Sequence, residues 1–233
     1  MFKSYFTDFL SLIFPVLCQA CGASLHNTET PICTNCLFNL PRTWYHMLPQ
    51  AQNPVAKTFW GRVPLRNASA YYRFTKSGKV QHLLHALKYN GRQDVGHTIG
   101  RFYGADLAAD KNYQSIDAIV PLPLHPARQR KRGYNQAQAF ADGLATQLRV
   151  SVLPHACARA KHTTTQTDKG RYDRWTNTQG IFEVKNPQAL TGKHILLVDD
   201  VITTGATIEA CAQAILQVPN TTLSVAAIAY AQI

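Results

Sequence analysis

Residues 195–207 read Ile-Leu-Leu-Val-Asp-Asp-Val-Ile-Thr-Thr-Gly-Ala-Thr, and this stretch decides the fold. Four aliphatic residues predict a buried strand, with Asp199 and Asp200 at its carboxyl end and a helix after the Thr-Thr-Gly-Ala-Thr turn. Ligands of open α/β sheets bind just outside the carboxyl ends of the strands. A turn that opens a helix also offers free N–H groups and a favourable dipole to an anion. The stretch therefore predicts a phosphate site beside two carboxylates, which suits a phosphorylated sugar because carboxylates accept hydrogen bonds from vicinal hydroxyls.

The segments around this stretch alternate between helix and strand patterns. Apolar periodicity predicts helices near 80–87, 94–109 and 137–148, and short apolar runs predict strands near 116–120, 150–154, 182–184 and 223–230. This alternation predicts an α/β domain over 65–233 with a doubly wound, mainly parallel sheet. Residues 41–64 are rich in Pro, Asn and Gln, so we expect a linker there.

Positive charge is concentrated in one quarter of the chain. The formal net charge is +11 over 233 residues. Residues 120–175 carry an excess of basic over acidic side chains, and their cations include Arg128, Arg130, Lys131 and Arg132. This concentration favours a polyanionic ligand, either one that bears pyrophosphate or a nucleic acid. A basic surface that only aids solubility is the alternative.

Four of the six cysteines form two Cys-x-x-Cys pairs near the N-terminus: Cys18, Cys21, Cys33 and Cys36. This spacing is typical of a four-thiolate zinc site. Four protein ligands leave no open position for a water, so the predicted role is structural. A pair of disulfides is the competing interpretation, and it requires an oxidising compartment.

The first seventeen residues resemble an export signal only superficially. Apolar residues between Phe2 and Ile13 fall on one helical face, and polar residues such as Lys3 and Asp8 interrupt them. A secretory h-region is apolar all round, and a membrane-spanning helix is longer. We expect an amphipathic helix that docks on the body of the protein, with membrane-surface or partner binding as an alternative. The expected location is cytoplasmic, with no integral membrane segment.

Two further stretches combine turns with cations. Residues 119–126 (Ile-Val-Pro-Leu-Pro-Leu-His-Pro) predict a strand that ends in a turn stiffened by Pro121 and Pro123, and four cations in five residues follow. Asn135 can cap the next helix. Residues 163–174 combine hydroxyls with Lys169 and Arg171, as in a mobile cover that closes over a charged substrate. A solvated charge run and an exposed loop are the alternatives for these two stretches.

The run 195–207 resembles the 5-phosphoribosyl-1-pyrophosphate (PRPP) motif of type I phosphoribosyltransferases. With Ala86-Leu87-Lys88-Tyr89, 120–126, Arg132-Gly133-Tyr134-Asn135-Gln136 and Thr165-Gln166, the chain resembles the ComF (ComFC/GntX) family of competence-associated proteins along essentially its whole length. The resemblance implies that Asp199 and Asp200 are the catalytic carboxylates, facing the ribose 2′ and 3′ hydroxyls. It implies phosphate or pyrophosphate contacts at Thr203, Thr204, Gly205, Ala206, Thr207, Pro121, Leu122, Pro123 and Arg132. It implies a flexible catalytic loop with Gln166, Lys169 and Arg171.

The resemblance further implies a role in natural transformation or DNA uptake, with PRPP or a related ribose 5-phosphate compound as ligand and Mg²⁺ carried with PRPP. Whether the chain turns over a substrate is open. One alternative is a non-catalytic competence protein that binds single-stranded DNA, with a translocase or helicase as partner. A second is an active purine or amido phosphoribosyltransferase of nucleotide salvage. Residues 1–40 form the predicted module of amphipathic helix and zinc site.

Overall fold

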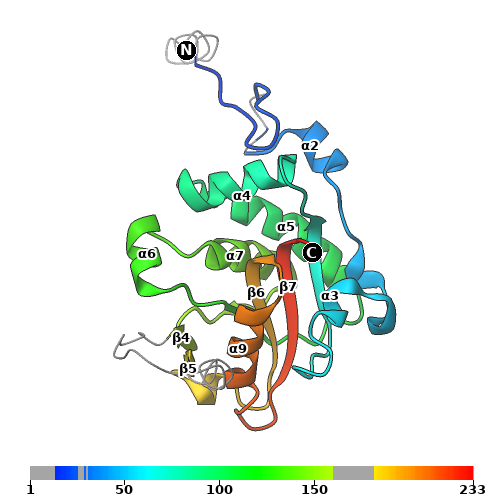
Figure 1. Cartoon of the computed structure of the whole chain (residues 1–233), viewed down its shortest axis with the longest axis vertical. Coiled ribbons are helices and arrows are strands. Elements are labelled where there is room, and N and C mark those ends of the chain that lie inside the picture. Colours follow the sequence, from blue (N-terminus) through cyan, green and yellow to red (C-terminus); the bar gives the residue numbers. More distant parts are fainter. Residues whose placement is uncertain (1–13, 26–28, 30, 160–180, 233) are drawn as a thin grey trace, which may run out of the picture.

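The computed structural model describes residues 14–25, 29, 31–159 and 181–232, and it contains a five-stranded parallel sheet (Figure 1). The strand order is β1-β7-β6-β2-β3, and every neighbouring pair is parallel. The strands are β1 (Ala68–Arg73), β2 (Ala118–Pro121), β3 (Ser151–Val152), β6 (His194–Ile202) and β7 (Thr222–Tyr230). A second, antiparallel pair joins β4 (Cys157–Arg159) to β5 (Phe182–Val184). The predicted α/β class with a mainly parallel sheet is confirmed.

Helices cover both faces of the sheet and bury a separate core on each. The helices are α2 (Thr34–Asn39), α3 (Pro54–Lys57), α4 (Lys79–Tyr89), α5 (Gln93–Ala109), α6 (Pro126–Arg132), α7 (Gln136–Leu148) and α9 (Ala206–Ile215), with 3-10 turns η1 (Tyr45–Met47), η2 (Gln50–Gln52) and η3 (Pro187–Ala189). Helices α4, α5 and α7 bury Leu196 and Val198 of β6 on one face. Helices α3 and α9 bury Ile195 and Leu197 on the other. Successive strand residues point to opposite faces, so β6 is apolar on both sides, as a strand inside a parallel sheet must be.

Glycines allow α5 and α7 to pack backbone against backbone. A Cβ atom on Gly100 of α5 would lie 2.4 Å from the carbonyl oxygen of Phe140 and 2.9 Å from the Cα of Gly143. No side chain fits at that separation. The close approach fixes α7 against the sheet, and the start of α7 therefore holds the cationic segment before it in place.

Strand β6 is longer than the sequence predicts. It pairs with β2 from Ile195 to Val198 and with β7 from His194 to Ile202. The last residues of β6 therefore extend beyond the end of their pairing with β2 and pair with β7. Asp199 and Asp200 therefore belong to the strand itself instead of following it. Both carboxylates are only partly exposed as a result.

The segment 41–64, expected to be a linker, carries short helices and buried side chains. Tyr45, Val55, Phe59 and Val63 belong to the same core as α9 and the face of β6 that it covers. Asn53 caps α3 through hydrogen bonds from the backbone N–H groups of Val55 and Ala56. The composition of 41–64 reflects helix caps and turns more than an extended connection. The division of the chain into residues 1–40, 41–64 and 65–233 stays a prediction.

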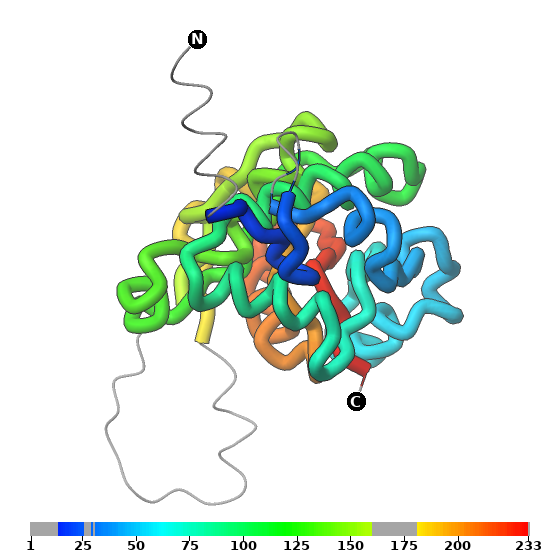
Figure 2. The backbone as a smooth tube through the Cα atoms, turned by 90° about the horizontal axis from the view of Figure 1, so that it is seen from above, coloured from blue at the N-terminus to red at the C-terminus, as the bar shows by residue number. Residues whose placement is uncertain are grey.

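The cysteine segment lies on top of α4 and α5 (Figure 2). Cys18, Ile32 and Leu40 share one core with Leu83 and Leu87 of α4. The amphipathic helix predicted before Phe14 lies outside the described residues. Within the ranges that the structure describes, no helix is long and apolar enough to cross a membrane.

Candidate functional site

The two carboxylates of β6 lie beside each other at the carboxyl edge of the sheet. The backbone N–H of Asp200 donates to Oδ1 of Asp199 at 2.7 Å, and Nζ of Lys88 lies 3.1 Å from Oδ1 of Asp200. Burial, followed by the neighbouring charge of Asp200, raises the pKa of Asp199 to about 8. Asp199 therefore keeps its proton to a higher pH than a free carboxyl group does, because two adjacent carboxylates do not both ionise readily.

The turn 203–207 joins β6 to α9. Gly205 caps α9 with φ +76°, and Thr203, Thr204 and Thr207 are exposed. Helix α9 begins at Ala206, so its first backbone N–H groups lack partners within the helix and point into the turn. Hydroxyls and free N–H groups next to the positive end of a helix dipole form a site for an anion.

Segment 54–63 supports this turn from behind. Arg62 donates from Nη1 to Oε2 of Glu209 at 2.7 Å and from Nη2 to the carbonyl oxygen of Thr204 at 3.1 Å. Phe59 packs directly against Gly205, where an added Cβ would lie 2.7 Å from its Cε1. Glycine at 205 is thus required twice, by its positive φ and by the aromatic ring behind it.

The predicted second loop meets the carboxylates from β2. Pro121 ends β2, and Leu122 donates its N–H to the carbonyl oxygen of Val198 at 2.8 Å. Asn135 caps α7 through the N–H of Ala137 at 3.0 Å, and it also donates to the carbonyl oxygen of Leu122 at 3.0 Å. The predicted helix cap is confirmed, and the same side chain fixes the loop 121–123.

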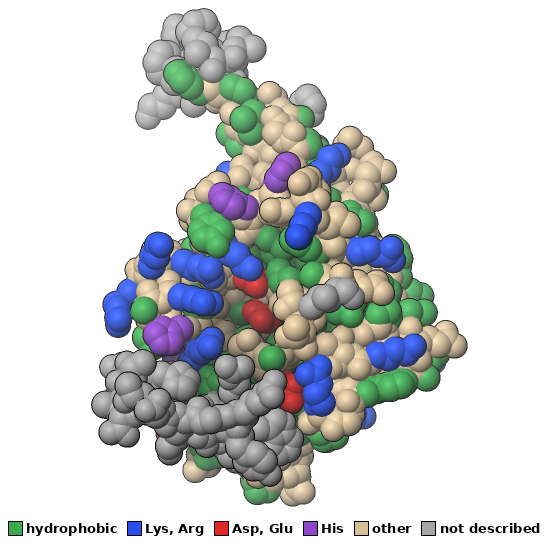
Figure 3. Space-filling model, viewed as in Figure 1, with side chains coloured by type: hydrophobic (Ala, Val, Ile, Leu, Met, Phe, Trp, Pro, Cys, Tyr) green, Lys and Arg blue, Asp and Glu red, His purple; other side chains and the backbone are tan. Residues whose placement is uncertain are grey.

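Cations converge on the cavity between these two loops. The cavity has a volume of about 140 Å³, and its charged lining consists of Lys88, Arg128, Arg132, Arg159, Asp199 and Asp200. Figure 3 shows the corresponding face, where a group of Lys and Arg side chains lies beside two acidic side chains. Leu122, Pro123 and Thr207 complete the wall. Such a cavity can bind a ligand that carries both vicinal hydroxyls and several phosphate charges.

The predicted site residues divide into four groups, one of which, Pro121, Thr204, Gly205 and Ala206, belongs to the two loops without lining either cavity. Asp199, Asp200, Leu122, Pro123, Arg132 and Thr207 line this one cavity. Thr203 lines a neighbouring cavity of about 350 Å³ that shares Lys88 and Asp200 with it. The predicted loop residues Gln166, Lys169 and Arg171 lie outside the described residues.

Sequence reasoning did not assign the roles of Lys88, Arg159 and Arg62. Lys88 stands near the end of α4, and its approach to Asp200 depends on how α4 packs on the sheet. Its only sequence signal was the Ala86-Leu87-Lys88-Tyr89 motif. Arg159 sits on the short β4, where burial and the neighbouring Arg128 lower the pKa of its guanidinium.

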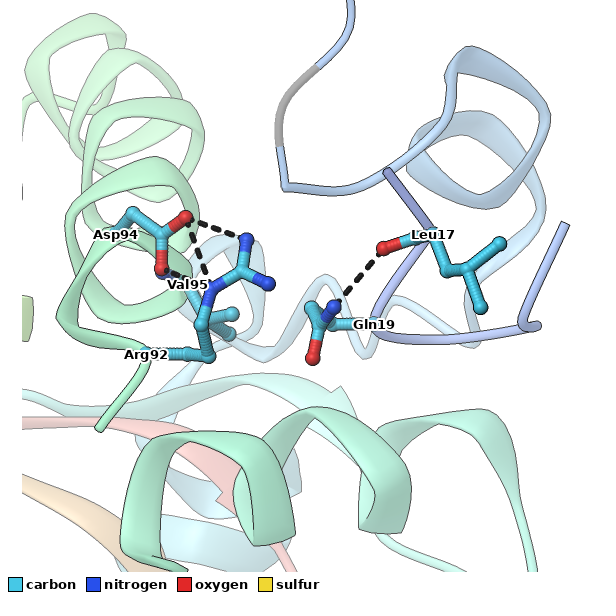
Figure 4. A network of polar contacts seen from close by, with 5 residues as sticks. All are labelled: Leu17, Gln19, Arg92, Asp94 and Val95. Carbon is cyan, nitrogen blue, oxygen red and sulfur yellow. Dashed lines mark hydrogen bonds and ion pairs between the residues drawn. The ribbon is translucent and has the colours of Figure 1, made fainter. Parts of the chain in front are cut away.

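The segment 91–98, which nearly matches a P-loop but has His97 where lysine is needed, forms a turn and the start of α5. Arg92 donates from Nη2 to Oδ2 of Asp94 at 2.7 Å and from Nε to Oδ1 at 3.0 Å (Figure 4). The N–H of Val95 donates to the same carboxylate at 3.1 Å. Asp94 therefore accepts hydrogen bonds both from the cation of this turn, Arg92, and from the backbone N–H of Val95.

The four cysteines of the N-terminal segment form one cluster. Their Sγ atoms lie within 4.8 Å of one another, and those of Cys21 and Cys33 are 3.8 Å apart. Thiolates about 2.3 Å from a tetrahedral zinc ion are about 3.8 Å apart. Burial by itself raises the pKa of Cys18, but backbone N–H donors, first that of Cys33, lower it to about 7. All four are free thiols, so the cluster can hold a metal ion such as zinc.

Comparison with known proteins places the chain in a class. Residues 135–231 match the phosphoribosyl transferase domain, which covers α7, β6, the turn 203–207, α9 and β7. A solved adenine phosphoribosyltransferase aligns with 63% of this chain and 74% of its own, at 19% identity and a TM-score of 0.40. The domain match and the parallel sheet together show a phosphoribosyltransferase-type fold, and a four-cysteine cluster lies near the N-terminus.

Several bacterial proteins are similar to this chain over part or most of its length. DNA utilization protein YhgH of Escherichia coli K12 is 27% identical over 86% of this chain and 84% of its own. Competence protein F of Haemophilus influenzae is 34% identical over 54% of this chain and 57% of its own length. Competence protein ComFC of Bacillus subtilis is 25% identical over 86% of this chain and 78% of its own length. The chain is therefore similar to proteins named for competence and for DNA utilization, in agreement with the predicted resemblance to the ComF family.

Proposed function

We propose that this protein binds PRPP or a related ribose 5-phosphate compound between β6 and α6, and that it acts in the use or uptake of DNA. The observation that carries the proposal is the joining of an acid pair and a phosphate-type turn to four cations in one cavity. The role in DNA metabolism rests on relatives named for competence and DNA utilization.

Each group of the ligand has a matching set of side chains. Asp200, which pairs with Lys88, accepts hydrogen bonds from a ribose hydroxyl, and Asp199, whose pKa is raised, can donate a hydrogen bond as well as accept one. The turn 203–207 receives the 5-phosphate at the start of α9. Arg128, Arg132 and Arg159 face the pyrophosphate. Mg²⁺ would bind mainly to the phosphate oxygens of the ligand. In proteins this ion usually keeps several waters and takes most of its other ligands from substrate phosphates.

Positioning and electrostatics would carry any transfer reaction. Loss of pyrophosphate from the anomeric carbon develops positive charge on the ribose and negative charge on the leaving group. The carboxylates stabilise the first and the arginines the second. The Lys88 ammonium lies 3.1 Å from Oδ1 of Asp200 in the free site. When ribose enters, Lys88 must move away, or Asp200 must accept hydrogen bonds from both Lys88 and the ribose hydroxyl.

Calorimetric titration with PRPP and Mg²⁺ tests the proposal. We expect saturable binding by the wild-type protein and its loss in the Asp199→Asn/Asp200→Asn double variant. A variant with the same change of charge, Asp94→Asn/Glu183→Gln, alters two acids outside the cavity and should bind as the wild type does. Absence of binding by the wild type, or equal binding by the double variant, would refute the assignment.

A second function, binding of single-stranded DNA, is favoured by a groove next to the cavity. Its volume is about 460 Å³, and its lining residues are Lys88, Tyr89, Gly91, Arg128, Lys131 and Arg132. The ring of Tyr89 is 66% exposed, with the guanidinium of Arg132 5.6 Å from its centroid. Exposed aromatic rings beside cations stack bases and pair with phosphates.

Salt dependence distinguishes the two functions. We expect Arg128→Gln/Lys131→Gln to lower the affinity for a single-stranded oligonucleotide and to reduce the slope of log K against log salt by about 1.4. Asp199→Asn/Asp200→Asn should leave that affinity unchanged or slightly higher. An unchanged salt dependence in Arg128→Gln/Lys131→Gln would mean that single-stranded DNA does not bind in this groove.

A further inference from the structure

A second cavity lies away from the acid pair, between η1 and the end of α5. Its volume is about 570 Å³, within the usual range for small-molecule sites. Trp44, His46 and Asp106 line it, together with Lys111 and Asn112 at its rim. It shares no lining residue with the cavity at Asp199 and Asp200. Neither the matched domain, which begins at residue 135, nor the predicted site includes any of these residues.

Unpartnered polar atoms of the described residues gather at this corner. The buried side-chain atoms without a hydrogen bond are Arg42 Nε, His46 Nδ1, Tyr71 OH, Tyr72 OH and Asp106 Oδ2. Arg42 connects them, because its guanidinium lies 5.2 Å from the ring centroid of Tyr71 and 3.7 Å from Asp106. Leaving buried polar groups unpaired destabilises a fold, so such a cluster needs an explanation. Two residues of this cluster, His46 and Asp106, also line the cavity, so the cluster lies directly behind the cavity wall.

Trp44 adds a second, independent anomaly. Its backbone has φ 56°, in the left-handed region that bulky residues rarely adopt, and its side chain is 48% exposed. Backbone strain of this kind persists where the surrounding structure enforces it, and it gathers at ligand sites. Here the strain places an indole ring at the mouth of the cavity, with the guanidinium of Arg42 5.4 Å from its centroid.

We propose that this cavity binds a nucleobase that carries an exocyclic amino group, as a free base or nucleoside. Trp44 offers an aromatic face on which a planar heteroaromatic ring stacks. The Asp106 side chain, which is 24% exposed and lines the cavity, accepts a hydrogen bond from the amino group, as acidic side chains do from cytosine. His46 lines the cavity beside it and faces the ring edge.

The charge of the lining favours a free base over a nucleic-acid strand. Asp106 and Asp110 line the cavity, with Lys111 as the one cation among its lining residues. A strand needs several cations for its phosphates, and those cations lie at α6 instead. Burial also lowers the pKa of His46 and raises the pKa of Asp106, which suits recognition of a neutral ring.

Fluorescence of Trp44 tests this site directly. The chain has three tryptophans, so Trp60→Phe/Trp175→Phe leaves Trp44 as the sole reporter. We expect adenosine and cytidine to quench it saturably, and uridine, which lacks the amino group, to bind at least about tenfold more weakly. Adding Asp199→Asn/Asp200→Asn to the reporter should leave the quenching unchanged, which separates this site from the proposed PRPP site.

Two substitutions locate the contacts. Asp106→Asn should weaken adenosine and cytidine binding by about tenfold and remove the preference over uridine, and His46→Gln should weaken all three. Asp94→Asn, an acid near the other end of α5, is the matched control and should have no effect. Absence of saturable quenching, equal binding of uridine, or unchanged affinity in Asp106→Asn and His46→Gln would each overturn the assignment. Tighter quenching by a single-stranded oligonucleotide than by adenosine would assign the cavity to a strand and overturn it as well.

Discussion

Replacement of Arg62 by glutamine should weaken phosphate binding at the turn 203–207, which the arginine supports from behind. Glu209 lies in the first turn of α9, where its negative charge opposes an anion at the helix N-terminus. Arg62 pairs with this carboxylate at 2.7 Å and also holds the carbonyl oxygen of Thr204. Without Arg62 the carboxylate acts on the phosphate unopposed.

The size of the effect follows from the helix geometry. Glu209 is the fourth residue of α9, so it lies about 6 Å along the axis from the helix start. Two unit charges at that separation in water interact by about 0.7 kcal/mol, and a phosphate dianion doubles this to about 1.4 kcal/mol. The expected loss is therefore about tenfold in affinity for PRPP. The ion pair is partly exposed, so the protein itself should lose only about 0.5–1 kcal/mol of stability.

Five proteins, the wild type and four variants, suffice for the assay, by calorimetry with PRPP and Mg²⁺ at low salt. We expect Arg62→Gln to bind about tenfold more weakly and Arg62→Gln/Glu209→Gln to recover most of the affinity. Glu209→Gln should bind at least as tightly as the wild type. Arg66→Gln removes the same charge from an exposed residue before β1 and should have little effect. Equal weakening in Arg62→Gln and the double variant would refute the electrostatic argument and leave only support of the Thr204 carbonyl.

Three further predictions concern stability and the metal. Gly205→Ala should lower the free energy of unfolding by about 2–4 kcal/mol in urea melts, because it adds a positive-φ penalty and a clash with Phe59; adding Phe59→Leu should restore only the part due to the clash. Burial raises the pKa of Asp199 to about 8, so the folded state retains a proton that the unfolded state loses near pH 4. The wild type should therefore lose stability as pH rises from about 4 to about 8, and an Asp199→Asn variant that followed the same slope in pH-dependent melts would contradict this. Removal of metal from the four-cysteine cluster with a strong chelator should expose residues 14–40 to protease while circular dichroism of the sheet domain persists, and unchanged proteolysis would speak against a structural metal.

Several features of the fold could be predicted because they depend on local patterns. The apolar run before Asp199, the helix periodicity of 80–87 and the Asn135 cap each act within a few residues of the chain. The four cysteines are close enough in sequence that their spacing alone implies a shared site. These predictions hold because turn geometry and side-chain periodicity are set by neighbours along the chain.

Segment 41–64 shows what local patterns leave out. Its Pro, Asn and Gln content is typical of a connection, yet Phe59 and Arg62 support the turn 203–207 from almost 150 residues away. The contact between Lys88 and Asp200 is equally remote in sequence. Neither composition nor periodicity carries information on such pairs.

The sequence by itself determined the parallel α/β fold, the acid pair, the phosphate-type turn and the four-thiolate cluster, because each is encoded within one short segment. Three properties depend on tertiary packing: which cations reach the acids, the raised pKa of Asp199, and the position of Arg62 behind the turn. The tertiary structure alone also revealed the cavity between Trp44 and Asp106. Those properties arise from burial and from charges brought together by the packing of distant segments, and both depend on the whole chain.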